Sequence, residues 1–238
     1  MKLDVLAIGV HPDDVELGCG GTVLKQVSLG YKVGILDLTQ GELGTRGSAE
    51  LRMIESENAK NILGVSVREN LKFRDGFFKN DEQHQLEIIK IIRKYKPDVI
   101  LANAPDDRHP DHGRAAALTY DAWFLSGLRK IETSIDGEIQ EAWRPKTFYH
   151  YIQAKFLKPD FVVDVSDFID KKMESIFAYK SQFHDLSSNE PQTFISSPEF
   201  IEFTKARSRE FGSPIGAKFA EGFIAKKLIG VDDISKIK

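Results

Sequence analysis

The fold is decided by residues 5–14, which read VLAIGVHPDD. Residues 5–10 form a short apolar run, which is typical of a strand buried on both faces of a sheet. The polar cluster His11-Pro12-Asp13-Asp14 follows this run at once. In open α/β sheets, ligands bind beyond the carboxyl ends of the strands. The cluster therefore stands where a site is expected.

Strand-like apolar runs alternate with segments of helical periodicity along the first half of the chain. The pattern predicts strands at residues 32–38, 70–73 and 98–102 and helices at 15–29, 48–63, 81–95 and 113–128. This order predicts a mostly parallel sheet with helices on both faces. Right-handed crossovers then give an α/β fold, a Rossmann-like three-layer sandwich.

The second half of the chain is less regular. We expect strands at 147–151 and 161–165, helices at 168–183 and 198–211, and a loop near a binding site at 187–198. Neither a linker nor an internal repeat divides the chain. We therefore expect a single domain over residues 1–238, made of a Rossmann-like core (1–128) and a C-terminal elaboration (129–238).

Composition places the chain among ordinary globular proteins. Hydrophobic residues make up 41% and charged residues 29%, which is close to average usage and argues against disorder. The net charge of −3 argues against a nucleic-acid partner, which needs a basic face. The sequence has no apolar run of about 18 residues, as a membrane span requires, and its start predicts no signal peptide. Since Cys19 is the only cysteine, we expect a cytoplasmic protein without disulfides or a membrane partner.

A second polar cluster, DDRHPDH at residues 106–112, follows the strand expected at 98–102. The carboxyl ends of parallel strands lie at the same edge of a sheet, so the two clusters are expected to meet there. A hydrolytic zinc usually takes three protein ligands and leaves a position for water. His11, Asp14 and His112 satisfy that requirement, with one Zn²⁺ per chain. The same donors also suit Fe(II), Co(II) or Mn(II).

The remaining residues of the two clusters suggest the other parts of a hydrolytic site. Asp13 is left free to act as a general base towards the water. His109 or Arg108 is placed to stabilise a developing oxyanion. Asp111 is expected to orient an imidazole through its carboxylate.

Other interpretations compete with the metal site. A His-Pro-Asp stretch alone is often only a turn, because proline fixes φ and aspartate bonds its own backbone. Residues 18–22, GCGGT, invite a dinucleotide interpretation, but their spacing does not fit G-x-G-x-x-G. Small residues there are more typical of close packing between a helix and the sheet. A non-enzymatic nucleotide- or sugar-binding module is the alternative to an enzyme.

The two clusters together make the chain resemble the LmbE-like zinc deacetylases, or PIG-L family. The matching segments are His11-Pro12-Asp13-Asp14, Gly20-Gly21-Thr22, Glu50-Leu51-Arg52, His109-Pro110-Asp111-His112 and Phe219-Ala220-Glu221-Gly222-Phe223. The resemblance implies zinc ligation by His11, Asp14 and His112, with Asp13 as the general base and His109 at the oxyanion. It also implies a homo-oligomer, a trimer or hexamer.

Within that family the chain is most similar to the bacillithiol-pathway branch, which deacetylates N-acetylglucosaminyl malate. A malate substrate has two carboxylates, and arginine forks bind carboxylates well. Arg52 and Arg108 are the candidates, with Arg144 a weaker third, although Arg52 equally fits a surface salt bridge. Relatives in this branch have a tyrosine near Phe200, which lacks the hydroxyl. A thiol-conjugate amidase and a chitooligosaccharide deacetylase are the alternatives that use the same metal site.

Overall fold

The computed structural model describes residues 1–183 and 189–237. In these ranges seven strands form one sheet in the order β3-β2-β1-β4-β7-β9-β8. The strands are β1 (Val5–Gly9), β2 (Val33–Thr39), β3 (Val67–Phe73), β4 (Val99–Ala102), β7 (Thr147–Tyr151), β8 (Phe161–Asp164) and β9 (Ala220–Ala225). The strands from β3 to β7 run parallel, and β9 runs antiparallel to both of its neighbours. The predicted mostly parallel α/β fold is confirmed.

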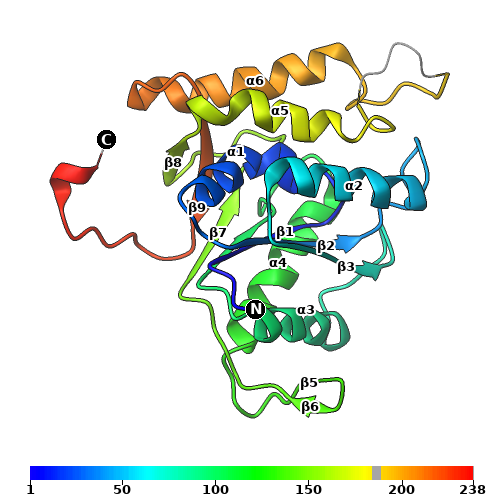
Figure 1. The fold of residues 1–238 in the computed structure, drawn as a ribbon, viewed down its shortest axis with the longest axis vertical. Helices are drawn as coiled ribbons and strands as arrows, with labels where there is room; N and C mark the ends of the chain where they lie inside the picture. The colour runs from blue at the N-terminus through cyan, green and yellow to red at the C-terminus, as the bar shows by residue number, and fades with distance from the viewer. Residues whose placement is uncertain (184–188, 238) are drawn as a thin grey trace.

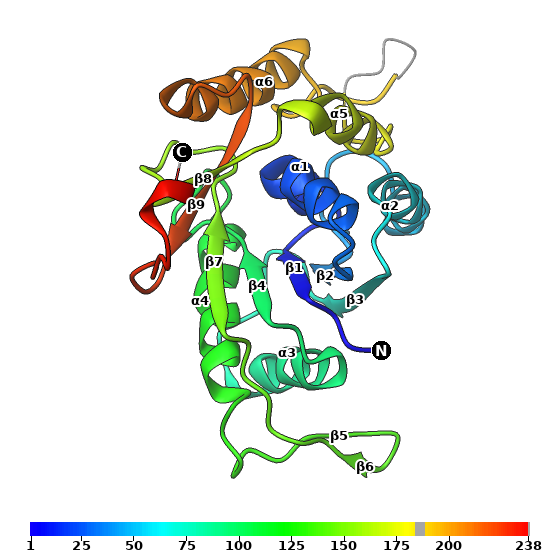
Figure 2. The same ribbon diagram turned by 60° about the vertical axis from the view of Figure 1, so that its left-hand side comes forward.

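Helices cover both faces of the sheet (Figure 1). They are α1 (Asp14–Ser28), α2 (Ala49–Leu63), α3 (Glu82–Tyr95), α4 (Pro110–Leu125), α5 (Ile169–Phe177) and α6 (Pro198–Gly212). Figure 2 shows α3 and α4 on one face and α1 and α2 on the other, with α5 and α6 stacked outside α1 and α2. This outer layer comes from the C-terminal elaboration, which also supplies β7, β8 and β9 to the common sheet.

The central strands explain why the first apolar run marks the fold. Every residue of β1 and β2 is buried, as a strand covered by helices on both faces requires. Val5 pairs with Val33 on one side and with Val99 on the other. The segments after β1 and β4, which carry the two polar clusters, therefore leave the sheet at neighbouring positions on one edge.

Several boundaries differ from the sequence predictions. The helix expected from residue 113 begins at Pro110, because proline suits the first position of a helix, and this places His112 in the first turn. The helix expected at 168–183 ends at Phe177. Beyond it, the Ser181 N–H and hydroxyl each donate to the Glu55 carboxylate at 2.7 Å, and these bonds compete with helix continuation.

Three strands were not predicted. β9 contains Glu221 and Gly222, which are poor strand formers, and the hairpin strands β5 (Ser134–Ile135) and β6 (Glu138–Ile139) are very short. β3 begins at residue 67 rather than 70. In the loop expected at 187–198, residues 187 and 188 lie outside the described residues.

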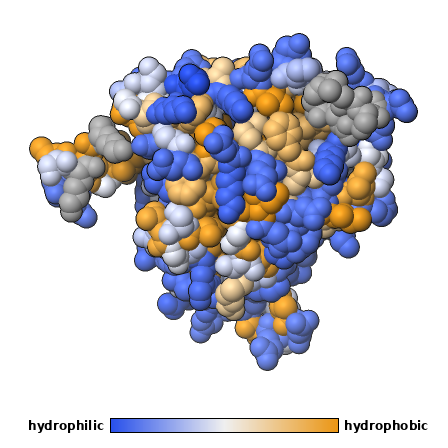
Figure 3. All heavy atoms as spheres, turned by 45° about the horizontal axis from the view of Figure 1, so that its top comes forward, coloured by the Kyte–Doolittle hydropathy of each residue, from blue (hydrophilic) through white to orange (hydrophobic). Residues whose placement is uncertain are grey.

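After β9, residues 228–237 form an arm along one side of the molecule (Figure 1, Figure 3). Leu228 and Ile234 in this arm are 98% and 85% exposed. None of its described residues lines the cavity that lies at the carboxyl ends of β1, β3 and β4. Within the described ranges, no helix is both long and apolar enough to span a membrane. The homo-oligomer stays a prediction, since the structure holds one chain.

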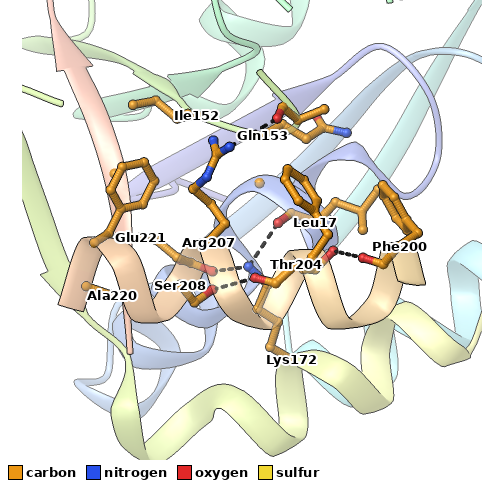
Figure 4. Close-up of a pocket in the computed structure, with 15 residues that line it drawn as sticks. Leu17, Ile152, Gln153, Lys172, Phe200, Thr204, Arg207, Ser208, Ala220 and Glu221 are labelled. Carbon is orange, nitrogen blue, oxygen red and sulfur yellow. Dashed lines mark hydrogen bonds and ion pairs between the residues drawn. The ribbon is translucent and has the colours of Figure 1, made fainter. Parts of the chain in front are cut away.

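Helix α1 is broken at Cys19, whose φ of −146° and ψ of 21° are not helical. The break frees backbone groups, and the buried side chains of Lys172 and Glu221 bind them. Figure 4 shows Lys172 between Glu221 and the Leu17 carbonyl. Glu221 accepts from the Gly21 and Thr22 N–H groups at 2.9 and 2.7 Å, and the Lys172 ammonium donates to Glu221 at 2.6 Å and to the Leu17 carbonyl at 2.9 Å. The glycine-rich stretch is thus a packed helix break.

Candidate active site

The carboxyl ends of β1, β3 and β4 face a cavity of about 360 Å³, a volume in the range of small-molecule sites, roughly 300–1,000 Å³. The lining includes all of the predicted metal ligands, Asp13, His109 and two of the three predicted arginines: His11, Asp13, Asp14, Arg52, Arg108, His109 and His112. Thr193, Phe194 and Ile195 complete one wall, so the described part of the loop expected at 187–198 lies at the site. The sequence clusters therefore meet in one cavity.

Of the three residues expected to bind metal, Asp14 lies close to both of the others, His11 and His112. Asp14 Oδ1 lies 3.2 Å from His112 Nε2, and Asp14 Oδ2 lies 3.6 Å from His11 Nδ1. Ligands held at 2.0–2.2 Å around a tetrahedral ion would be about 3.4 Å apart. The two Asp14 separations are close to this value, and two imidazoles with a carboxylate suit a divalent ion such as zinc.

Asp14 is held by four donors, which fix its two oxygens. Its Oδ2 accepts from the Val10 and His11 N–H groups, both at 3.0 Å, and from Asn103 Nδ2 at 3.1 Å. Its Oδ1 accepts from Gln153 Nε2 at 2.9 Å. Such outer partners fix a metal ligand before the ion arrives. Asn103 and Gln153 follow β4 and β7, so residues after two strand ends support the Asp14 carboxylate.

Asp75 and Asp107 are the carboxylates that hydrogen-bond the imidazoles of His11 and His112, the two histidines expected to bind metal. Asp107 Oδ2 lies 2.7 Å from His112 Nδ1, and Asp75 Oδ1 lies 3.0 Å from His11 Nε2. Asp111, the residue chosen from the sequence for such a role, instead accepts from the Gly76 N–H at 2.9 Å and from Arg114 at 2.7 Å. Its nearer oxygen is 4.0 Å from His11 Nε2. Asp75 follows β3 and could have been found by the rule that identified the other clusters.

The electrostatics of the cluster favour added positive charge. Burial opposes the charged form of His112, but Asp14 and Asp107 outweigh it and raise its pKa to about 10. Burial likewise opposes charge on His11, yet hydrogen bonds to Asp14 and Asp75 raise its pKa to about 9. Burial would raise the pKa of Asp14, but His112 and His11 hold it well below its usual value. A metal ion that binds there replaces these protons, because only a neutral imidazole can be a ligand.

Asp13 occupies a strained backbone position at the start of α1. Its φ of 132° and ψ of −20° lie where residues with a side chain are rarely found, a conformation that costs about 1–3 kcal/mol. The residue is buried, and burial raises the pKa of its carboxyl to about 7, against the opposing effect of Arg52. A pKa near neutrality suits a general base.

Arg52 faces Asp13 from α2. Its Nη2 lies 3.4 Å from Asp13 Oδ2 and donates to Gln182 Oε1 at 2.5 Å. The side chain is only 6% exposed, so it is not the surface salt bridge that the sequence left open. Gly41, with φ +65°, is required beside it because an added Cβ would overlap the guanidinium.

His109 caps α4, and its ring lies among the ligand imidazoles, 4.8 Å from His11 and 5.3 Å from His112 between centroids. Its Nδ1 accepts from the Asp111 N–H at 3.3 Å, which leaves Nε2 to carry the proton. Burial, together with His11 and His112, lowers its pKa. The ring is therefore a neutral donor.

The other predicted arginines lie apart from Arg52. Arg108 is exposed at the mouth of the cavity, and its guanidinium stacks 4.6 Å from the Phe194 ring centroid. Arg144 lies at the far end of α4, where it donates to the Phe124 carbonyl, outside the cavity. Phe200 is buried and stacks on Phe183, so it fills a hydrophobic cluster of the outer layer.

Comparison with known proteins gives these residues a family context. The family model described as PIG-L, GlcNAc-PI de-N-acetylase, matches residues 6–123. A diacetylchitobiose deacetylase of Thermococcus kodakarensis is 32% identical over 191 residues, which cover 75% of this chain and 70% of the relative. The chain belongs to the PIG-L family. The resemblance inferred from the two polar clusters is confirmed.

Two further similarities extend over most of this PIG-L chain. A probable N-acetyl-α-D-glucosaminyl L-malate deacetylase 2 of Bacillus anthracis is 27% identical over 197 residues, 75% of this chain and 81% of the relative. A crystal structure of a conserved protein of Thermus thermophilus has a TM-score of 0.85 and 36% identity, and covers 97% of this chain and 98% of its own. This PIG-L chain is therefore an enzyme, an amide hydrolase of the deacetylase type.

Proposed function

We propose that the chain removes the acetyl group from an N-acetylglucosamine glycoside, using one Zn²⁺ held by His11, Asp14 and His112. One observation carries the proposal: the Asp14 carboxylate lies 3.2 Å from His112 Nε2 and 3.6 Å from His11 Nδ1, in the same cavity as Asp13 and His109. A binding module has no need for a strained, buried carboxylate beside such a cluster. Zinc is proposed because two imidazoles and one carboxylate are a common catalytic zinc set.

An ion bound there would polarise the acetyl carbonyl and lower the pKa of water. Asp13 takes the proton from the attacking water, since its carboxyl is beside the ligand Asp14 and has a pKa near neutrality. Arg52 holds one Asp13 oxygen and favours its charged form. The proton then passes from Asp13 to the leaving amine, which balances the hydrolysis.

His109 stabilises the negative charge that develops on the acetyl oxygen. Its Nδ1 is occupied as an acceptor, so Nε2 is the donor that faces the reaction. A neutral imidazole fixed by a backbone N–H needs no reorganisation during the reaction, which is what makes such donors effective. Asp107 and Asp75 keep His112 and His11 oriented meanwhile.

The group attached to the sugar has two candidates, each with support. The exposed Arg108 suits a malate carboxylate, and the Bacillus anthracis relative is described as acting on a malate conjugate. Arg52, the second arginine expected for malate, has its charge balanced by Asp13. The Thermococcus kodakarensis relative, at the higher identity, is described as a diacetylchitobiose deacetylase. We therefore propose that the attached group is another sugar, with malate as the alternative.

The test is acetate release from N,N′-diacetylchitobiose, N-acetylglucosaminyl malate and N-acetylglucosamine by the zinc-loaded protein. A chelated sample and the same sample with zinc restored are the controls. We expect release that is lost on chelation and recovered with zinc. Zinc bound at one per chain without acetate release from any of the three would contradict the proposed function.

A further inference from the structure

One side of the cavity mouth combines an exposed aromatic ring with an exposed cation. Phe194 is 56% exposed, and the guanidinium of Arg108 lies 4.6 Å from its ring centroid. The two residues come from different segments, one before α6 and one before α4, and both line the cavity that contains His11 and His112. A single exposed phenylalanine needs no explanation. An exposed phenylalanine that is held in place beside a catalytic cluster does need an explanation.

Phe194 is held in place by its neighbours. The Thr193 N–H donates to the Ser196 hydroxyl at 2.8 Å, and Ser196 itself is only 2% exposed. The Phe194 ring also packs edge-on against Phe200, with centroids 5.4 Å apart. Phe200 in turn stacks on the buried Phe183. The ring therefore stands on the hydrophobic cluster of the outer layer, oriented before a ligand arrives.

Arg108 keeps its hydrogen-bonding capacity. Among the described residues, no side chain or carbonyl accepts a hydrogen bond from its guanidinium, and the ring of Phe194 is its recorded contact. An arginine stacked on an aromatic face still presents its N–H groups at the edge of the plane. The mouth thus offers an apolar surface and several donors next to each other.

We propose that Phe194 and Arg108 form the subsite for the group attached to the reacting N-acetylglucosamine, and that this group is a second pyranose ring. The inference rests on the proposed function and names its substrate class. A pyranose has an apolar C–H face, which suits the phenyl ring, and hydroxyls, which accept from the guanidinium. A dicarboxylate would use the cation but leave the ring exposed. Arg52, the other arginine of the described lining, is already paired with Asp13, so a second carboxylate would have no unpaired arginine there.

The test compares Phe194→Ala with Phe124→Ala. Phe124 is a matched control, because it is 48% exposed and stacked 4.2 Å from the guanidinium of Arg144, yet it lies outside the cavity. We expect Phe194→Ala to lower kcat/KM for N,N′-diacetylchitobiose about tenfold more than for N-acetylglucosamine, mainly through KM. Phe194→Tyr should keep the wild-type ratio, and Phe124→Ala should change neither substrate.

Two results would overturn the subsite while leaving the deacetylase intact. One is an equal loss on the monosaccharide and the disaccharide in Phe194→Ala, which would make the ring a structural element only. The other is a wild-type preference for N-acetylglucosaminyl malate over the disaccharide. Absence of acetate release from every substrate in the zinc-loaded wild type is a different outcome, since it rejects the proposed function and the subsite with it.

Discussion

Two clusters of buried charge lie along α1, and they differ in how their charges are balanced. At the helix break, Lys172 and Glu221 form a neutral pair (Figure 4). The Glu221 carboxylate also accepts from two backbone N–H groups. At the helix start, Asp13 and Asp14 lie among imidazoles and further carboxylates beside an open cavity. The first cluster is complete without a ligand, whereas the second favours an added cation.

The comparison shows which features separate a functional site from a structural one. Both clusters are buried, and both bring together residues distant in sequence. Only the cluster at the helix start combines raised histidine pKa values, a strained residue at Asp13 and access to solvent. Burial of charge is therefore weak evidence of function, because a paired ion can simply hold two elements together.

The largest effect is expected from Asp13→Asn. Losing the general base should lower kcat by about 10²–10⁴-fold, while zinc stays bound because the ligands remain. Acetate release and zinc content measured on the same preparation give the result. Glu221→Gln, a carboxylate-to-amide change in the other cluster, is the control and should keep kcat near wild type. Similar losses of kcat in the two variants would break the distinction between the clusters.

The next effect concerns stability rather than catalysis. Lys172→Met should reduce the free energy of unfolding by about 3–5 kcal/mol, because it leaves Glu221 buried without its counter-ion. The double variant Lys172→Met/Glu221→Gln should regain part of this loss. Urea unfolding measures both. Zinc bound per folded chain should not change in either variant, and loss of the ion would show that the break is coupled to the site.

A smaller effect involves His150, a buried histidine that is neutral at pH 7. Burial lowers its pKa to about 4, and its Nδ1 donates to the Asn103 carbonyl at 2.6 Å. Below pH 6.5 the unfolded chain takes up a proton that the folded chain refuses until about pH 4, so stability falls as pH falls through this window. The expected loss from pH 6.5 to 5 is about 2 kcal/mol.

His150→Gln removes this titration while it keeps a side-chain donor for the carbonyl. The difference in unfolding free energy between wild type and variant should therefore shrink by the same amount as the pH is lowered. Urea unfolding at pH 6.5 and 5, with zinc saturating in both samples, checks the prediction. A pH-independent difference would show that His150 titrates normally in the folded chain.

Much of the fold and of the candidate site could be predicted because their signals are local. Buried parallel strands appear in the sequence as unbroken apolar runs. Each polar cluster comes soon after such a run, at residues 5–10 and 98–102. The signals for the ends of α2 are equally local. Ser48 caps the helix by accepting from the Leu51 N–H, and Gly64 ends it with a φ of +70°.

The remaining features depend on contacts between distant residues. Asp75 follows β3, which lies at the sheet edge and has a mixed polar sequence, so its strand was only partly recognised. Phe194 lies in an irregular loop, and only the fold places it above the cavity. The partners of Arg52 and Asp111 could not be predicted for the same reason. Arg52 contacts Asp13 and Gln182, and Asp111 contacts Gly76 and Arg114.

The most direct test of the account is zinc binding by the wild type and by Asp14→Ala, measured by calorimetry on metal-free protein. We predict one ion per wild-type chain and a loss of at least a hundredfold in affinity in Asp14→Ala, since one of three protein ligands is removed. Glu221→Gln should bind zinc as the wild type does. Tight zinc binding that survives Asp14→Ala would contradict the assignment of His11, Asp14 and His112 as the metal site.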